Sequence, residues 1–138
     1  MLMQQWLLYS LLALAMWGIW GFLPKVALIQ FKPESVLIWQ GIGAALSTFL
    51  FFLFSPFSLQ TSNLGIMAGV GVGIFAFLGS LFFIFALSTG KASAVVTLTA
   101  LYPLITIFLA ILFLGETLTI RMFLGVIFAV IAIYLMGH

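Results

Sequence analysis

Residues 64–88 read LGIMAGVGVGIFAFLGSLFFIFALS, a stretch of 25 residues without a charged side chain. About 20 mostly apolar residues are enough for a helix to cross the hydrocarbon core of a bilayer. Four further apolar stretches flank this one, at residues 6–30, 34–54, 92–114 and 120–137. The sequence therefore predicts five membrane-spanning helices.

The composition of the whole chain excludes a water-soluble fold. Of its 138 residues, 66% are hydrophobic and 4% are charged, whereas about 25% of residues are charged in ordinary soluble domains. Such a chain cannot cover an outer surface with polar side chains, and it is too apolar to be disordered. Its net charge of +2 rests on very few groups, so no nucleic-acid partner is expected.

Enzymatic activity is not expected either, and neither is a metal or another cofactor. The chain has no Cys and a single His at its end, which removes the usual nucleophilic and metal-binding sets. Its two acidic residues, Glu34 and Glu116, lie at or near predicted loops and do not form a pair of catalytic carboxylates.

The predicted connections between the five helices carry turn-forming residues. They are Phe31-Lys32-Pro33, the stretch 55–63, Thr89-Gly90-Lys91 and Gly115-Glu116-Thr117. Because these loops are too short to fold independently, we expect a single membrane domain over residues 1–138. The first apolar stretch has neither a positively charged start nor a cleavage site of small residues, so we expect it to remain as a helix.

The distribution of Lys and Arg predicts the orientation in the membrane. One face receives Arg121, and the opposite face receives Lys25, Lys32 and Lys91. The positive-inside rule then favours an external N-terminus and an internal C-terminus. If Lys25 lies within the membrane, the count of Lys and Arg becomes one on the first face against two on the other. Insertion in both orientations (dual topology) is therefore also expected.

Two prolines lie inside predicted membrane helices, Pro24 in the first and Pro103 in the fourth. Each removes one helical hydrogen bond and releases the carbonyl four residues earlier, at Trp20 and at Thr99. Protein or water must satisfy such a carbonyl at membrane depth. Two interpretations stay open: ordinary kinks within helix packing, or kinks that face a shared internal cavity.

Lys25 also has two interpretations. It lies 19 residues after Trp6, about 28 Å along a helix, and can extend its ammonium to the membrane surface. Alternatively it points inward on the helix face that also carries Trp17 and Gly21. An ionisable group at membrane depth is expensive, at least ~2.5 kcal/mol at the helix centre, and is a functional hypothesis by default.

Three glycines of the third helix, Gly65, Gly69 and Gly73, recur at four-residue intervals. Small residues at this spacing allow the backbones of two helices to approach closely, so they predict a packing seam. Room for a substrate, or for helix sliding, is the alternative interpretation.

Two regions of the chain resemble the EamA domain of the drug/metabolite transporter superfamily. In the second half, Gly90-Lys91-Ala92-Ser93-Ala94 enters a helix, Tyr102-Pro103-Leu104 lies within it, and Leu114-Gly115-Glu116-Thr117-Leu118-Thr119 forms the turn before a helix with Gly125. In the first half, residues 17–25, WGIWGFLPK, are similar to the first-helix signature of small five-helix bacterial and archaeal members.

This resemblance implies an all-α integral membrane protein, a five-transmembrane-helix EamA-like bundle that forms one half of a ten-helix inverted-repeat transporter. It implies a half-size secondary transporter of a small metabolite in a prokaryotic inner (cell) membrane, acting as a homodimer that is expected to be antiparallel. The first helix lacks the acid of small multidrug resistance relatives, and Lys25 favours a neutral or anionic solute. A lipid-linked substrate flippase and a non-transporting scaffold or accessory subunit are the alternatives.

The two proline-containing helices are expected to line the substrate cavity, because they carry several polar or amphipathic residues that lipid disfavours. The residues expected nearest to a solute are Trp17, Trp20, Lys25, Thr99, Tyr102 and Pro103. The helix over residues 120–137 is expected to lie at the periphery or at the dimer contact.

Overall fold

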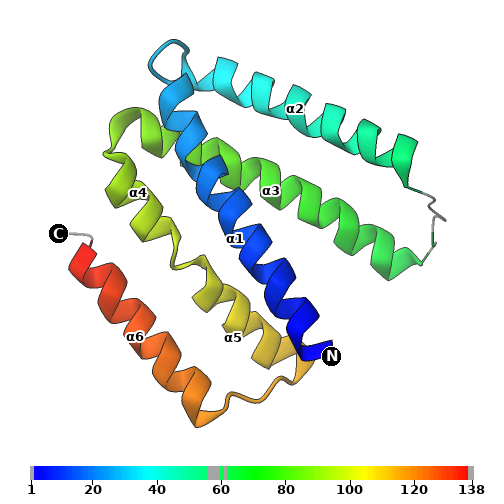
Figure 1. The fold of residues 1–138 in the computed structure, drawn as a ribbon, viewed down its shortest axis with the longest axis vertical. Coiled ribbons are helices and arrows are strands. Elements are labelled where there is room, and N and C mark those ends of the chain that lie inside the picture. The colour runs from blue at the N-terminus through cyan, green and yellow to red at the C-terminus, as the bar shows by residue number, and fades with distance from the viewer. Residues whose placement is uncertain (1, 56–59, 61, 137–138) are drawn as a thin grey trace. The chain divides into compact units, whose positions relative to one another are not determined.

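The computed structural model describes residues 2–55, 60 and 62–136, and all regular structure in this part of the chain is helical. The helices are α1 (Leu2–Ala27), α2 (Pro33–Phe54), α3 (Asn63–Thr89), α4 (Ala92–Thr99), α5 (Tyr102–Leu114) and α6 (Ile120–Met136) (Figure 1). The predicted all-α class is therefore confirmed. Gly137, the predicted end of the last helix, and most of the predicted 55–63 turn lie outside the described residues.

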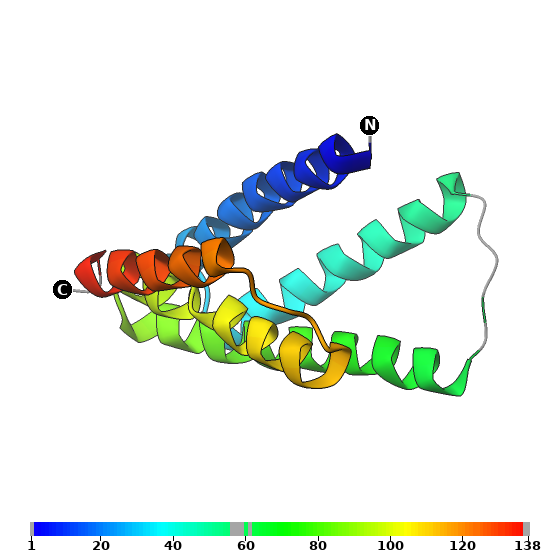
Figure 2. The same ribbon diagram turned by 90° about the horizontal axis from the view of Figure 1, so that it is seen from below.

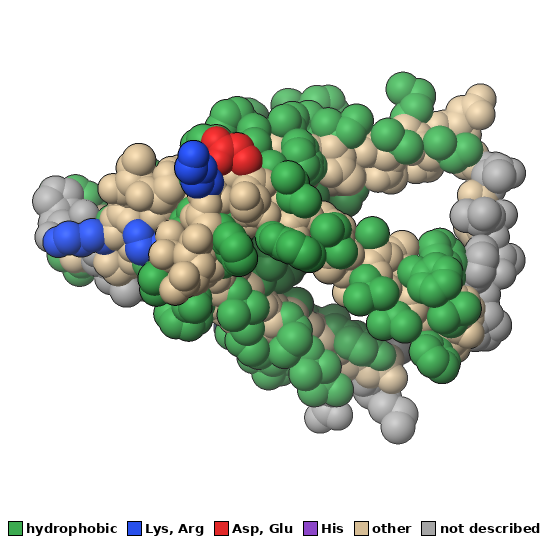
Figure 3. All heavy atoms as spheres, turned by 90° about the horizontal axis from the view of Figure 1, so that it is seen from above, with side chains coloured by type: hydrophobic (Ala, Val, Ile, Leu, Met, Phe, Trp, Pro, Cys, Tyr) green, Lys and Arg blue, Asp and Glu red, His purple; other side chains and the backbone are tan. Residues whose placement is uncertain are grey.

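Within the described part of the chain, four helical segments are long and apolar enough to cross a membrane: Gln5–Ala27, Pro33–Phe54, Asn63–Thr89 and Ala92–Leu114. The segment Ile120–Leu135 is apolar but shorter. Large hydrophobic side chains remain exposed along these helices, and hydrophobic groups dominate the surface in Figure 3. An apolar surface of this extent is suited to lipid or to another protein and not to water.

The chain divides into two compact units, Met1–Thr89 and Gly90–His138. In the first unit, α3 packs against both α1 and α2. These helices converge where α1 turns into α2, and they diverge toward the opposite end (Figures 1 and 2). Burial follows the same gradient, because Val36 of α2 is buried and residues 41–54 of the same helix are exposed.

The end of α1 differs from the prediction. The sequence predicts a helix over residues 6–30, whereas α1 ends at Ala27 and residues 28–30 form turns. Ile29 N donates to Val26 O at 3.2 Å and Gln30 N to Ala27 O at 3.0 Å, which are bonds between residues three apart. The proline at position 33 favours extended backbone at Lys32, where φ is −72° and ψ is 155°, so the chain leaves the helix early.

The fourth predicted helix, over residues 92–114, forms one apolar span that is interrupted next to Pro103, where the sequence predicts a kink. It consists of α4 and α5, separated by Ala100 and Leu101. Leu101 N donates to Leu98 O at 3.2 Å and Leu104 N to Leu101 O at 3.0 Å, so the break is a tight turn. Pro103 is the cause, because it has no N–H to donate and its ring excludes the carbonyl of Thr99.

The link between α5 and α6 confirms the predicted turn at Gly115-Glu116-Thr117. Gly115 ends α5 in the left-handed region, with φ 67° and ψ 23°, which a residue without a Cβ adopts at low cost. At the start of α6, Thr119 Oγ1 accepts a hydrogen bond from Met122 N at 3.3 Å. Glycine therefore stops one helix, and a threonine side chain caps the next.

Candidate functional site

The C-terminal half of α3 carries the most buried side chains of the first unit. Ser80, Phe83, Ile84 and Leu87 are all buried, and Ile84 and Leu87 are completely so. Their spacing of three and four residues places them on one face of the helix. We call this face, defined by these four residues, the α3 face.

Trp20 of α1 stacks on this face. Its ring lies 5.3 Å from the ring of Phe83, centroid to centroid, and the two planes differ by 17°. Gly21 and Pro24, which follow on α1, are buried as well. Pro24 does not end the helix, since α1 continues to Ala27. The interpretation of Pro24 as a residue of helix packing accounts for this burial.

Lys25 donates a hydrogen bond from Nζ to the carbonyl oxygen of Leu87, at 2.7 Å. The last four carbonyls of a helix have no partner within the helix, and a cation at this end is favourable to the helix dipole. Leu87 lies in the last turn of α3, so the ammonium satisfies one of these carbonyls. The side chain is therefore held at the convergent end of the unit and is half-buried.

A polar pair joins α2 to α3. Gln40 Nε2 donates to Ser80 Oγ at 2.9 Å. Gln40 lies seven residues into α2, about 10 Å along the helix from Pro33, which is well below the helix end. Its Oε1 atom is buried, and no group in the described part of the chain donates a hydrogen bond to it. An unsatisfied buried acceptor of this kind is uncommon.

The second unit contains a groove of about 340 Å³, lined by Ala100 and Leu101, by α5, by the α5–α6 loop and by α6. Its walls are mainly apolar, and Gly125 and Ala129 of α6 contribute small side chains. The helix break lies along one wall, since Ala100, Leu101 and Pro103 all line the groove. Glu116 contributes a carboxylate from the loop end.

The residues predicted to line a cavity occupy different positions. Trp20 and Lys25 face α3, whereas Trp17 is exposed and has 62% of its surface accessible. Of the three residues on the fourth predicted helix, Pro103 lines the groove, but Thr99 and Tyr102 are not among its lining residues and are exposed. Their convergence on one cavity remains a prediction.

The glycines of the predicted seam have free space around them within this chain. A Cβ built at Gly69 or at Gly73 meets no atom within 4 Å, and one at Gly65 meets only the side chain of Ser62, at 3.6 Å. The buried residues of α3 lie in its C-terminal half, away from these glycines. The seam is thus available to another helix.

Comparison with known proteins identifies the type of molecule. Residues 4–137 match the model of the EamA-like transporter family. The chain belongs to this family. It is therefore an integral, multi-pass membrane protein of a transporter family, and the resemblance found in the sequence is confirmed.

One curated relative of this EamA-like chain is the uncharacterized protein MJ1333.1 of Methanocaldococcus jannaschii. The two are 48% identical over 48 residues, which is 35% of this chain and 35% of the relative. The match thus spans about a third of the relative's length. No solved structure matches the chain significantly.

Two contacts of the EamA-like chain were missed by sequence reasoning, Gln40 with Ser80 and Phe83 with Trp20. Gln40 carried a usable signal, because it is an amide side chain within the apolar run 36–46. A polar side chain at membrane depth normally faces a protein partner. Phe83 carried no such signal, since it is one of four phenylalanines between residues 77 and 85.

Proposed function

We propose that this EamA-like chain is a half-size secondary transporter that moves a small neutral or anionic metabolite across a prokaryotic cell membrane. Its functional unit is a homodimer, expected to be antiparallel, in which two copies supply the two repeats. We propose no enzymatic activity and no cofactor for this chain, because members of the family are transporters.

The break in the fourth span is the observation that carries this proposal. Irregular backbone at membrane depth persists only where it is buried in protein or lines a cavity. Here Ala100, Leu101 and Pro103 line a groove of about 340 Å³. Ala100 and Leu101 keep right-handed helical backbone angles, so the feature is a proline interruption, and proline-interrupted membrane segments point to the binding sites of secondary transporters.

The proposed path takes its lining from the first and fourth predicted helices. Trp17, Trp20, Lys25, Thr99, Tyr102 and Pro103 are its proposed lining residues. The hydroxyl of Thr99 already uses its hydrogen within its own helix, because Oγ1 donates to Val95 O at 2.9 Å. A solute would contact the oxygen of that hydroxyl as an acceptor.

Cysteine labelling tests the lining. The native chain has no Cys, so Thr99→Cys and Tyr102→Cys each introduce a single thiol. We expect a membrane-impermeant maleimide to modify both in proteoliposomes, and excess solute to slow the reaction. Phe128→Cys on α6 is the matched control, because α6 lies outside the proposed lining and this exposed position is expected to face lipid and to stay unlabelled. Labelling at position 128 but at neither 99 nor 102 would contradict the proposed lining.

Solute uptake tests transport itself. Proteoliposomes preloaded with a candidate metabolite are expected to take up the labelled form by counterflow, and empty liposomes are not. A panel of small neutral and carboxylate-bearing metabolites covers the proposed class. Absence of counterflow and of lipid translocation would leave the scaffold or accessory-subunit reading.

A lipid-linked substrate flippase is the second candidate, and the walls of the groove favour it. Most lining residues between Leu104 and Ile133 carry aliphatic side chains, which suit a hydrocarbon chain better than a polar solute. Transfer of a fluorescent polyprenyl phosphate between leaflets of proteoliposomes distinguishes this function from solute counterflow.

A further inference from the structure

A second pocket lies at the convergent end of the first unit, remote from the groove in sequence. Its volume is about 390 Å³. The turn between α1 and α2 and the end of α3 line it, and two lysines contribute to the lining, Lys25 and Lys32. No part of the proposed transport path accounts for Lys32.

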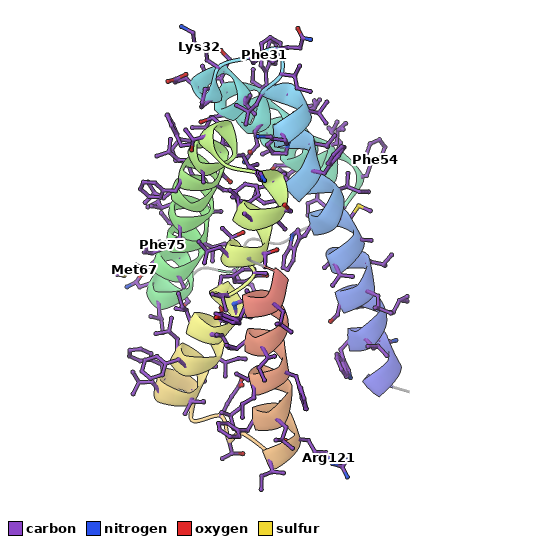
Figure 4. All side chains as sticks on the ribbon, turned by 90° about the vertical axis from the view of Figure 1, so that its left-hand side faces the viewer. Phe31, Lys32, Phe54, Met67, Phe75 and Arg121 are labelled. Atoms are coloured by element: carbon purple, nitrogen blue, oxygen red, sulfur yellow. The ribbon has the colours of Figure 1, made fainter. Side chains whose placement is uncertain are left out.

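The two lysines differ in how they are held. Lys25 is fixed by the Leu87 carbonyl at 2.7 Å, so its positive charge stays at the pocket wall. Lys32 is exposed, precedes the first residue of α2 and makes no side-chain cap bond there. Figure 4 shows Phe31 and Lys32 projecting from this turn. The Lys25 ammonium is therefore held by a hydrogen bond, whereas the Lys32 ammonium lies at the end of a long, exposed side chain.

The remaining walls are mainly apolar, with Leu28, Ile29 and Phe31 beside the two lysines, and Ser88 is the other polar residue of the lining. Glu34 is the nearest acid along the chain, but it is exposed and does not line the pocket. Both α1 and α3 end here, and their carbonyl ends carry a partial negative charge, which the Lys25 ammonium offsets at α3.

Charge and apolar surface together specify an amphipathic anion at the membrane boundary. The pocket lies where three membrane segments end, which is the depth of lipid headgroups. Lysines at this depth attract anionic lipids by about 1 kcal/mol each, whereas a free phosphate would gain nothing from the apolar walls.

We propose that this pocket binds the phosphate of an anionic phospholipid, with Lys25 and Lys32 beside the headgroup and Leu28, Ile29 and Phe31 against the start of an acyl chain. This site shares Lys25 with the proposed lining of the transport path, but lipid binding at it does not depend on transport and is measured without it. It makes the lipid a resident ligand of the α1–α2 turn and not a transported substrate.

Native mass spectrometry of the full chain in mild detergent tests the proposal. The probes are dioleoyl phosphatidylglycerol and dioleoyl phosphatidylcholine, which share their acyl chains and differ in net charge. We expect preferential retention of phosphatidylglycerol. Lys32→Gln should weaken it about fivefold, and Lys25→Gln together with Lys32→Gln should weaken it further. Lys32→Arg should retain it.

Lys91→Gln is the matched control, because Lys91 is an exposed loop lysine that does not line this pocket. Lys91 contributes general attraction near the membrane boundary and no pocket contact, so Lys91→Gln should weaken retention less than Lys32→Gln does. The proposal is overturned if the two lipids bind equally, if Lys91→Gln weakens binding as much as Lys32→Gln, or if Lys32→Arg behaves like Lys32→Gln. Displacement of the lipid by millimolar glycerol phosphate would assign the pocket to a soluble phosphate and overturn the lipid assignment.

Discussion

Lys25 joins the ends of two helices, because its ammonium donates to the Leu87 carbonyl at 2.7 Å. Replacement by Met keeps most of the stem but leaves the last turn of α3 without this donor. We expect a loss of about 1 kcal/mol, since hydrogen bonds to charged groups are among the stronger ones and the site is only half-buried. Thermal unfolding in detergent measures it as a lower Tm.

Lys32→Met is the control for this change. Its side chain is exposed and makes no cap bond, so its effect on stability should stay within about 0.5 kcal/mol. If Lys25→Met and Lys32→Met lose equal stability, the cause is the positive charge near the turn and not the hydrogen bond to Leu87.

The pair of Gln40 and Ser80 gives a second prediction at this scale. We expect a coupling of about 0.6 kcal/mol in a cycle of Gln40→Met, Ser80→Ala and the double variant, which is typical of hydrogen bonds between membrane helices. The cost of the unsatisfied Oε1 of Gln40 cancels in the cycle, because it enters both steps that replace Gln40. Unfolding in mixed micelles measures it, and additive losses would mean that the two side chains do not interact in the membrane.

Among the elements, the interrupted fourth span allows the most direct test. Pro103→Ala restores an N–H that can donate to Thr99 O, so we expect α4 and α5 to join into one helix. Hydrogen exchange at residues 100–104 should slow, helix content should rise slightly, and counterflow should fall if the break belongs to the transport path.

Pro33→Ala is the matched control for Pro103→Ala. Pro33 is the first residue of α2, where a missing N–H has no helical acceptor to lose. Exchange around residue 33 and counterflow should therefore change little. Unchanged exchange at 100–104 in Pro103→Ala would mean that tertiary contacts, and not the proline, interrupt the helix.

Hydropathy is sufficient to predict that these helices exist, but it does not predict which faces meet. The α3 helix is apolar on every side, so no amphipathic stripe marks its buried face. Phe82 and Phe83 illustrate this, with 69% and 8% of their surfaces exposed. The observed helix ends differ from the predicted ones near Ala27 and Leu101, where hydrogen bonds between residues three apart occur in place of helical bonds between residues four apart. The turn at Gly115 was predicted correctly, because its conformation is local.

For the whole molecule, the seam of Gly69 and Gly73 leads to a prediction about assembly. A Cβ built at either position meets no atom of the described residues within 4 Å, so we expect Gly69→Leu with Gly73→Leu to leave the monomer folded. If the seam packs against the second copy, this variant should shift crosslinked dimer toward monomer in mild detergent.

Gly71→Leu provides the comparison. Gly71 also has no atom within 4 Å of a built Cβ, but it lies two residues from Gly69 and therefore on the other side of α3. It should leave the dimer intact. Equal dimer loss in both variants would argue against a contact specific to the seam, and unchanged dimer in both would place the interface elsewhere.

The convergence of α1, α2 and α3 at one end makes that end a pivot. Buried contacts concentrate near Leu87, and α3 extends from there to Leu64, about 35 Å away along the helix axis. A rotation of about 10° at the pivot would move the far end by about 6 Å. Among the described residues of the first unit, the contacts that resist this rotation lie close to the pivot, so they have little leverage. The far ends of the helices can therefore swing at low energetic cost while the pivot stays intact.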